Sequence, residues 1–144
     1  MFKRILIPTD GSELTQKAAA TAIGLAKTLG AALCTLSVKE PFPYSAISEM
    51  QPVPPQEFFD ARERVASERV NAVRTACKAA GQACEAHTVE AVHPWEAIIE
   101  HATTTGCDLI VMSSHGRRGV AALLLGSETQ KVLTHTSIPV LVVR

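Results

Sequence analysis

The sequence lacks an excess of charge of either sign, because Lys and Arg together number 14 and so do Asp and Glu. A chain with balanced charge does not attract nucleic acid or an anionic membrane as a whole, so any anion site must be local. No apolar run approaches the ~18–20 residues that cross a bilayer, and the N-terminus lacks the apolar stretch of a signal peptide. These absences predict a cytoplasmic protein with no nucleic-acid and no membrane partner.

The sequence also lacks paired cysteines and clustered histidines. The cysteines form no C-x-x-C pair and no disulfide-like cluster, so we expect small buried hydrophobes in a reducing compartment. They are Cys34, Cys77, Cys84 and Cys107. Four histidines lie apart without metal-ligand spacing, and we expect surface or capping roles for them. They are His87, His93, His101 and His135.

What is present suits one packed domain over residues 1–144, of which 47% are hydrophobic. Short apolar runs ended by turn residues predict strands at 5–8, 33–38, 83–89, 108–112 and 138–143. Apolar residues spaced by three and four predict a helix after each of the first four strands. The alternation predicts an α/β fold, with a parallel sheet covered by helices on both faces.

Local signals predict where these helices begin and end. Ser12 is expected to cap the first helix and Ser127 the last, with Gln130 three residues after Ser127. The second helix is expected to start near Phe59. Five prolines between residues 39 and 56 predict a loop, and the alternative that Tyr44 and Met50 close over a ligand stays open.

Two strand ends carry unusual residues. The first strand runs into Pro8-Thr9-Asp10-Gly11-Ser12, and the fourth runs into Ser113-Ser114-His115-Gly116. In an open parallel sheet, ligands bind at the carboxyl ends of strands where the strand order reverses. If these two strands are neighbours, both tips line one crevice.

The glycine-containing loop after the fourth strand is the sharpest local signal. Gly116 and Gly119 let backbone N–H groups approach an anion, and Gly126-Ser127 places a helix N-terminus beside them. Arg117 and Arg118 add positive charge. This pattern suits a polyphosphate, or else a surface turn with a helix cap. It matches neither the Walker loop nor the dinucleotide fingerprint.

Asp10 and His115 each have two interpretations. Asp10 either accepts hydrogen bonds from a ribose or base or helps to hold a metal, or else it caps the first helix or braces its turn. His115 either donates to a phosphate or serves as a base, although no orienting carboxylate is near it in sequence.

Together these segments resemble the universal stress protein family over essentially the whole chain. The resemblance is carried by three stretches: Ile5 to Ser12, Asp108 to Ser127, and Ile138 to Val143. The ATP-binding pattern of that family is Gly, two residues, Gly, nine residues, then Gly followed by Ser or Thr. Gly116 and Gly126-Ser127 match it, whereas Ser113 replaces the first glycine.

The resemblance implies an adenine-nucleotide site, with or without Mg²⁺. The residues it implies are Pro8, Thr9, Asp10 and Val38 for the adenosine end; Met112, Ser113, His115, Gly116 and Arg117 for ribose and phosphates; and Gly126, Ser127, Glu128 and Thr129 for phosphate oxygens. It further implies a five-stranded parallel sheet in the order 3-2-1-4-5, the adenine nucleotide alpha-hydrolase-like fold. It also implies a homodimer through the C-terminal strand 138–143.

Three functions follow from these observations. The first is an ATP-binding stress-response regulator, which the loop favours. The second is a dimeric interaction protein without nucleotide, which Ser113 favours. The third is a slow ATPase, for which His115 and Asp10 are the only candidates to activate water.

Overall fold

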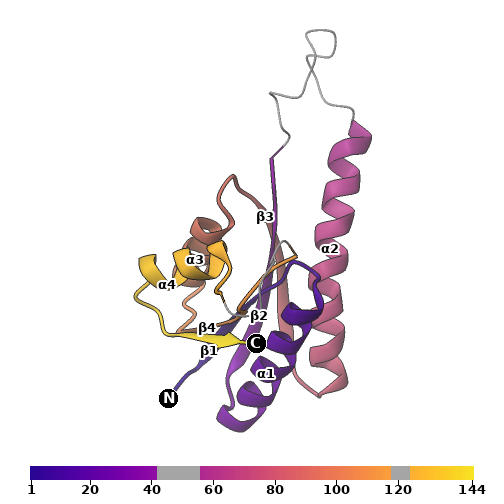
Figure 1. The fold of residues 1–144 in the computed structure, drawn as a ribbon. Helices are drawn as coiled ribbons and strands as arrows, with labels where there is room; N and C mark the ends of the chain where they lie inside the picture. Colours follow the sequence, from indigo (N-terminus) through magenta and orange to yellow (C-terminus); the bar gives the residue numbers. More distant parts are fainter. Residues whose placement is uncertain (42–55, 118–123) are drawn as a thin grey trace, which may run out of the picture.

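The computed structural model describes residues 1–41, 56–117 and 124–144 (Figure 1). Strands and helices alternate along the chain. They are β1 (Arg4–Pro8), α1 (Glu13–Leu29), β2 (Ala32–Lys39), α2 (Gln56–Ala79), β3 (Cys84–Glu90), α3 (Pro94–Thr104), β4 (Leu109–Ser113), α4 (Ser127–His135) and β5 (Val140–Val143). All neighbouring strands are parallel, and their order is β3-β2-β1-β4-β5, which confirms the predicted sheet.

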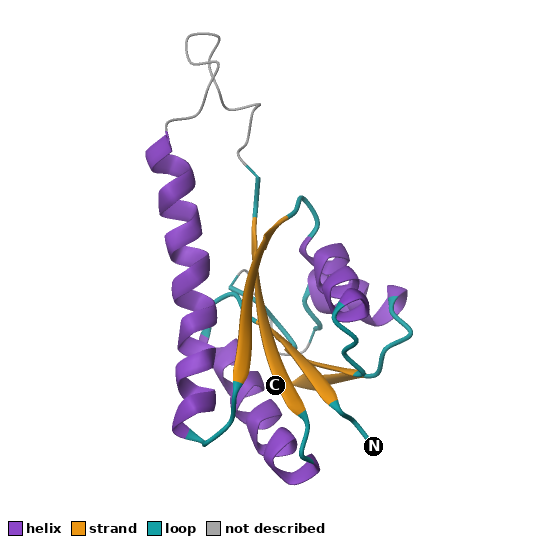
Figure 2. Ribbon diagram, turned by 180° about the vertical axis from the view of Figure 1, so that it is seen from behind, coloured by secondary structure: helices purple, strands orange, loops and turns teal. Residues whose placement is uncertain are grey.

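The two faces of the sheet are covered by different helices (Figures 1 and 2). Ile5 and Ile7 of β1 pack against α1 and α2, while Leu6 between them packs against α3 and α4. Successive side chains of a strand point to opposite faces, so one apolar run fills two cores. The continuous apolar runs of β1 and β4 therefore mark them as inner strands, buried on both faces.

Several predicted boundaries are confirmed and others move. The Ser12 hydroxyl accepts from the Thr15 N–H at 3.4 Å as the N-cap of α1, and Gly30 ends this helix in the left-handed conformation. α2 starts at Gln56, three residues before Phe59, and β2 continues to Lys39. The lid suggested for Tyr44 and Met50 lies outside the described residues.

The predicted cap of α4 is wrong by one residue. Gly126 is the N-cap, with φ −62° and ψ 151°, and no side chain caps this helix. The reason is tertiary, because the Gly126 N–H donates to the Ser114 carbonyl at 2.7 Å and holds this residue extended. Ser127 is therefore already the first helical residue.

The start of β1 is tied to the start of β4 by one carboxylate. Asp108 accepts from the Lys3 N–H at 2.9 Å and from the Arg4 N–H at 2.9 Å. Burial by itself would raise the pKa of Asp108, but the hydrogen bonds from these amides hold it below its usual range. The charged form is thus favoured in the folded protein.

We expect Asp108→Asn to lower the free energy of unfolding by about 1 kcal/mol at pH 7. Because the folded-state pKa is depressed, this contribution is present above the unfolded-state pKa and is lost as the pH falls through the folded-state value. Urea unfolding of both proteins between pH 7 and acidic pH measures it. Glu100→Gln, at an exposed carboxylate of α3, is the control. A difference that persists undiminished in acid would contradict the assignment.

Candidate functional site

The tips of β1 and β4 lie side by side, as the crevice requires. Ile5 pairs with Leu109 and Leu6 with Ile110, so the two strands run in register toward the same edge. Pro8 ends β1 and Ser113 ends β4. Strand order reverses at this point, since β2 and β3 lie on one side and β5 on the other.

Asp10 joins the two tips. Its Oδ1 accepts from the Ser12 N–H at 2.9 Å and from the Thr15 hydroxyl at 3.3 Å, which braces the turn before α1. Its Oδ2 accepts from the Arg117 N–H at 2.7 Å, on the loop after β4. Asp10 therefore braces its own turn, as one interpretation predicted, and also positions the glycine loop.

Gly116 and Gly126 allow three chain segments to meet. A Cβ built on Gly116 would lie 2.6 Å from the Asp10 Oδ2. A Cβ on Gly126 would lie 3.2 Å from the Ser114 carbonyl oxygen and 3.3 Å from the His115 Cα. Both glycines thus permit close approach, and the start of α4 lies directly against the His115–Gly116 segment.

The first turn of α4 presents the amides that an anion needs. The first intrahelical bond runs from Gln130 N–H to the Gly126 carbonyl. Within the described part of the chain, the N–H groups of Ser127, Glu128 and Thr129 have no acceptor. Such amides, with the positive end of the helix dipole, form an anion site. The Gly126 N–H is not available in this way, because it already donates to the Ser114 carbonyl.

Side chains fix this turn against the end of β4. The buried Thr129 hydroxyl donates to the Ser113 carbonyl at 2.9 Å. The Glu128 carboxylate turns away and accepts from the Trp95 N–H at 2.9 Å, at the start of α3. Thr129 and Glu128 thus position α4 with their side chains, and their amides are left as donors.

Ser113 fits the position where the nucleotide pattern has glycine. No non-glycine residue in the described ranges has a positive φ, so the backbone at Ser113 accepts a Cβ without strain. Its hydroxyl is buried and donates to the His115 carbonyl at 2.7 Å. The serine that stands in place of glycine therefore adds a hydrogen bond that holds the loop.

Arg69 of α2 belongs to the same site, although sequence reasoning missed it. A Cβ on Gly11, which has φ +79°, would lie 3.0 Å from the Arg69 Cγ. Burial and the charge of Arg117 lower the pKa of Arg69, while Asp10 acts in the opposite direction. The signal was available, because Arg69 stands three residues after Ala66 and four before Val73, on the buried stripe of α2.

Other predicted residues lie at the border of the crevice or below it. The Thr9 hydroxyl accepts from the Gly11 N–H at 3.2 Å, so it is used within the turn. Met112 is buried, and half-buried Val38 packs against the same core cluster under α3. Arg118 and Gly119 lie outside the described residues.

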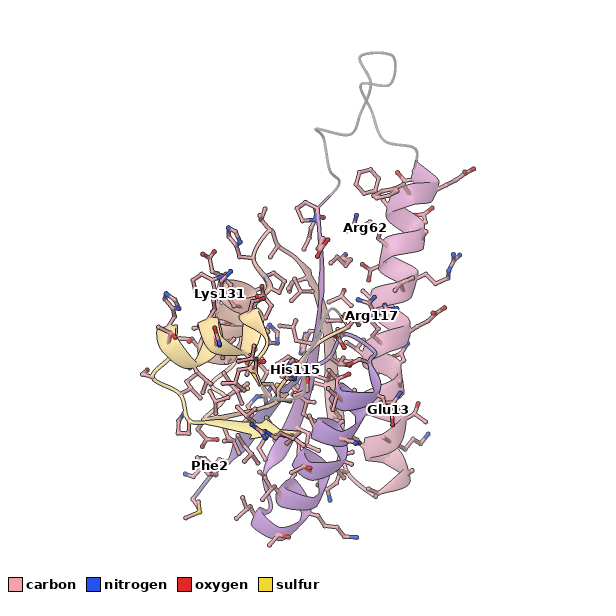
Figure 3. The ribbon with its side chains drawn as sticks, viewed as in Figure 1. Phe2, Glu13, Arg62, His115, Arg117 and Lys131 are labelled. Atoms are coloured by element: carbon pink, nitrogen blue, oxygen red, sulfur yellow. The ribbon has the colours of Figure 1, made fainter. Side chains whose placement is uncertain are left out.

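The ring of His115 lies beside a hydroxyl of its own loop and, in the part of the chain that the structure describes, not beside a carboxylate. Its Nδ1 lies 3.1 Å from the Ser114 hydroxyl. No carboxylate among the described residues hydrogen-bonds its ring, so the arrangement of an oriented base is not found there. In the view of Figure 3, His115 and Arg117 lie between α2 and the pair formed by α3 and α4.

Residues 1–41, 56–117 and 124–144 contain neither a cluster of metal ligands nor a membrane-spanning helix. No group of three or more His, Cys, Asp or Glu side chains in these ranges is placed to hold a metal ion. No helix in the same ranges is long and apolar enough to cross a membrane.

The fold and site define an α/β protein with a candidate anion site at the reversal of its strand order. Comparison with known proteins agrees with this class, because the model of the Universal stress protein family matches residues 1–144. A universal stress protein of Thermus aquaticus is 37% identical over 145 residues, and YxiE of Bacillus subtilis is 34% identical over 148 residues. Each alignment covers 100% of both chains. The chain belongs to the universal stress protein family.

Solved structures share this fold. The structure of MJ0577 of Methanocaldococcus jannaschii is 27% identical with a TM-score of 0.83, covering 99% of this chain and 96% of that one. A universal stress protein in complex with cAMP is 24% identical, with a TM-score of 0.70, and covers 99% and 97%. One from Archaeoglobus fulgidus in complex with dAMP is 16% identical, with a TM-score of 0.70, and covers 99% and 98%.

Proposed function

We propose that this protein binds an adenine nucleotide, with ATP as the first candidate, and acts as a stress-response regulator. The observation that carries the proposal is the set of amides at Ser127, Glu128 and Thr129, which lack acceptors within the described residues and lie against the Gly116 loop. Phosphate oxygens are the ligands that such a helix start binds best.

The charges around the loop favour a ligand with several negative charges. Arg117 follows Gly116, and Arg69 approaches from α2 close enough for the two guanidinium groups to influence each other. Arg69 and Arg117 place two cations at the crevice, and two carboxylates, Asp10 and Glu40, also act on Arg69. A polyphosphate, with Mg²⁺ held by its own oxygens, would pair with the two guanidinium groups.

The adenosine end would then lie toward β1 and β2. Pro8, Asp10 and Val38 stand at the carboxyl ends of these strands, next to the reversal of strand order. The proteins solved with cAMP and dAMP support an adenine ligand for this fold. Their identity to this chain is low, so the proposal depends on the loop geometry of the chain itself.

Calorimetry with Mg-ATP on the purified protein tests the proposal. We expect saturable binding and an increase of the melting temperature, because a ligand that binds only the folded state stabilises it. Absence of both heat and thermal shift at millimolar ATP would reject nucleotide binding.

Ser113→Gly is the informative variant in that experiment. It removes the hydrogen bond to the His115 carbonyl, and we expect about 1 kcal/mol lower stability with ATP binding retained. Binding that occurs only in this variant would instead favour an interaction protein without nucleotide.

We further propose that the protein forms a homodimer through β5. This strand lies at the edge of the sheet, and Leu141 on it is 38% exposed. The Pro139 and Val143 carbonyls accept from β4, so alternation directs the N–H and carbonyl of Val142 toward the open edge. An unpaired edge invites pairing with a second copy.

Val142→Pro is expected to shift the dimer to monomer, because it removes an outward N–H without removing a bond to β4. Light scattering across protein concentration measures the change. Val142→Ala, which keeps the N–H, is the matched control. An unchanged mass for Val142→Pro would show that β5 is not the interface.

A further inference from the structure

Two cysteine sulfurs meet on the sheet face covered by α3. Cys34 of β2 and Cys107, two residues before β4, are separated by 73 positions, yet their Sγ atoms lie 3.4 Å apart. Both are free thiols in the same buried cluster, and Cys34 is 0% exposed whereas Cys107 is 5% exposed. They lie toward the amino ends of the strands, whereas the candidate nucleotide site lies at the carboxyl ends.

The surroundings of Cys107 favour a thiolate. The Thr105 hydroxyl lies 3.4 Å from its sulfur. The positive charge of Arg4, on β1, also favours the ionised form of this sulfur. The Arg4 Nη2 donates to Glu85 at 2.7 Å, but its buried Nε has no hydrogen-bond partner among the described residues. A negatively charged sulfur would give that N–H an acceptor.

These contacts change the acidity of the two thiols in opposite directions. The hydrogen bond from Cys34, together with Thr105 and Arg4, lowers the pKa of Cys107 to about 6 against the opposing effect of burial. The same contact and burial raise the pKa of Cys34. Cys107 is therefore the nucleophilic sulfur at neutral pH, and the neighbouring thiol acts as its donor.

We propose that Cys107 is an oxidation site for hydroperoxides and that it forms an intramolecular disulfide with Cys34. The Cys107 thiolate attacks one peroxide oxygen and the O–O bond breaks. Cys107 becomes a sulfenic acid, and the departing hydroxide takes up a proton to leave as water. The Cys34 sulfur then attacks the Cys107 sulfur. The S–S bond forms, the S–O bond breaks, and the hydroxyl leaves as a second water with the Cys34 proton.

The balance is complete with hydrogen peroxide as the oxidant. The two thiols give up two electrons and two protons, and one peroxide is reduced to two waters. Cys107 is the sulfur that peroxide meets first, because it is the more exposed of the two. The resulting bond would connect β2 to the segment before β4, across β1.

The experiment treats the reduced full-length chain with hydrogen peroxide at pH 7 and maps its peptides without reduction. Trypsin leaves Cys84 and Cys107 in one peptide, since no Lys or Arg lies in residues 79–116. A glutamate-specific protease is therefore added. We expect a peptide of residues 28–39 joined to one of residues 101–117, lighter by two hydrogens than the sum of its parts.

Variants separate the proposed role from general oxidation. Cys84→Ser should leave the cross-link intact, whereas Cys107→Ser should abolish it and leave Cys34 reduced. Arg4→Gln should slow the cross-linking at least about fivefold, because it removes the cation near the thiolate. Glu85→Gln keeps Arg4 and removes the negative charge beside it, so it should not slow the reaction.

Three results with the wild-type protein would overturn the proposal. One is a disulfide between Cys77 and Cys84, which also influence each other through their side chains. Another is overoxidised Cys107 with Cys34 still reduced. The third is a folded protein, judged by circular dichroism, whose thiols do not react. None of these outcomes depends on nucleotide binding.

Discussion

Gly116→Ala is expected to weaken ATP binding by at least about tenfold and to lower the free energy of unfolding by about 2 kcal/mol. The added Cβ would lie 2.6 Å from the Asp10 Oδ2, so either the carboxylate or the loop must move. Either movement disturbs the 2.7 Å hydrogen bond from the Arg117 N–H to Asp10. Calorimetry with Mg-ATP and chemical unfolding measure the two effects.

Gly24→Ala is the matched control for this substitution. Gly24 lies on the exposed side of α1, and a Cβ there meets nothing within 4 Å. Alanine in a helix interior is more stable than glycine by about 0.5–1 kcal/mol, so this variant should gain stability and bind ATP unchanged. Equal behaviour of the two variants would show that the Gly116 contact is not required.

Asp10→Ala is expected to have the second large effect. It removes the acceptor shared by the Ser12 N–H, the Thr15 hydroxyl and the Arg117 N–H. We expect a loss of about 2 kcal/mol in unfolding free energy, because amides are left without their charged partner. ATP binding should weaken at least about tenfold, since the loop loses the contact that orients it.

Two further variants distinguish orientation from charge. Asp10→Asn keeps one acceptor oxygen, so its stability and affinity should lie between those of the wild type and Asp10→Ala. Glu13→Gln, three residues away at the exposed start of α1, removes a charge without touching the loop (Figure 3). Tighter ATP binding in Asp10→Ala would contradict the proposed role. It would mean that the carboxylate competes with the nucleotide for the Arg117 amide.

Much of the fold could be predicted from local sequence. Ile5 to Pro8 and Leu109 to Ser113 are apolar enough to indicate strands buried on both faces, and they form β1 and β4. Ser12 and Gly30 delimit α1 through their own capping preferences. Such signals are local because propensity and periodicity act within a few residues.

The candidate site was predicted in outline only. Its glycines and strand tips are visible in the sequence, because only glycine permits such close approach of backbone segments. The bond between Asp10 and the Arg117 amide spans 107 positions, and no spacing rule predicts it. For the same reason the sequence assigned Ser127 as the cap of α4, whereas the contact of Gly126 with Ser114 moves the cap to Gly126.

The cysteines show the same division. The sequence predicted buried thiols without pairing. Cys34, Cys77 and Cys107 are indeed buried, whereas Cys84 is half-buried. Nothing local brings Cys34 within 3.4 Å of Cys107, because that contact depends on how α3 returns the chain to the sheet.

The sequence by itself determined the alternating strands and helices, the helix ends set by local capping, and the small residues that let the loop after β4 lie close to its neighbours. The tertiary structure alone decided which side chains occupy that loop, that Arg69 joins it from α2, and that two distant thiols touch. The physical reason is the distance along the chain over which each kind of interaction acts. Backbone preferences act over a few residues, whereas the side chains that meet at the edge of a parallel sheet come from segments far apart in the chain.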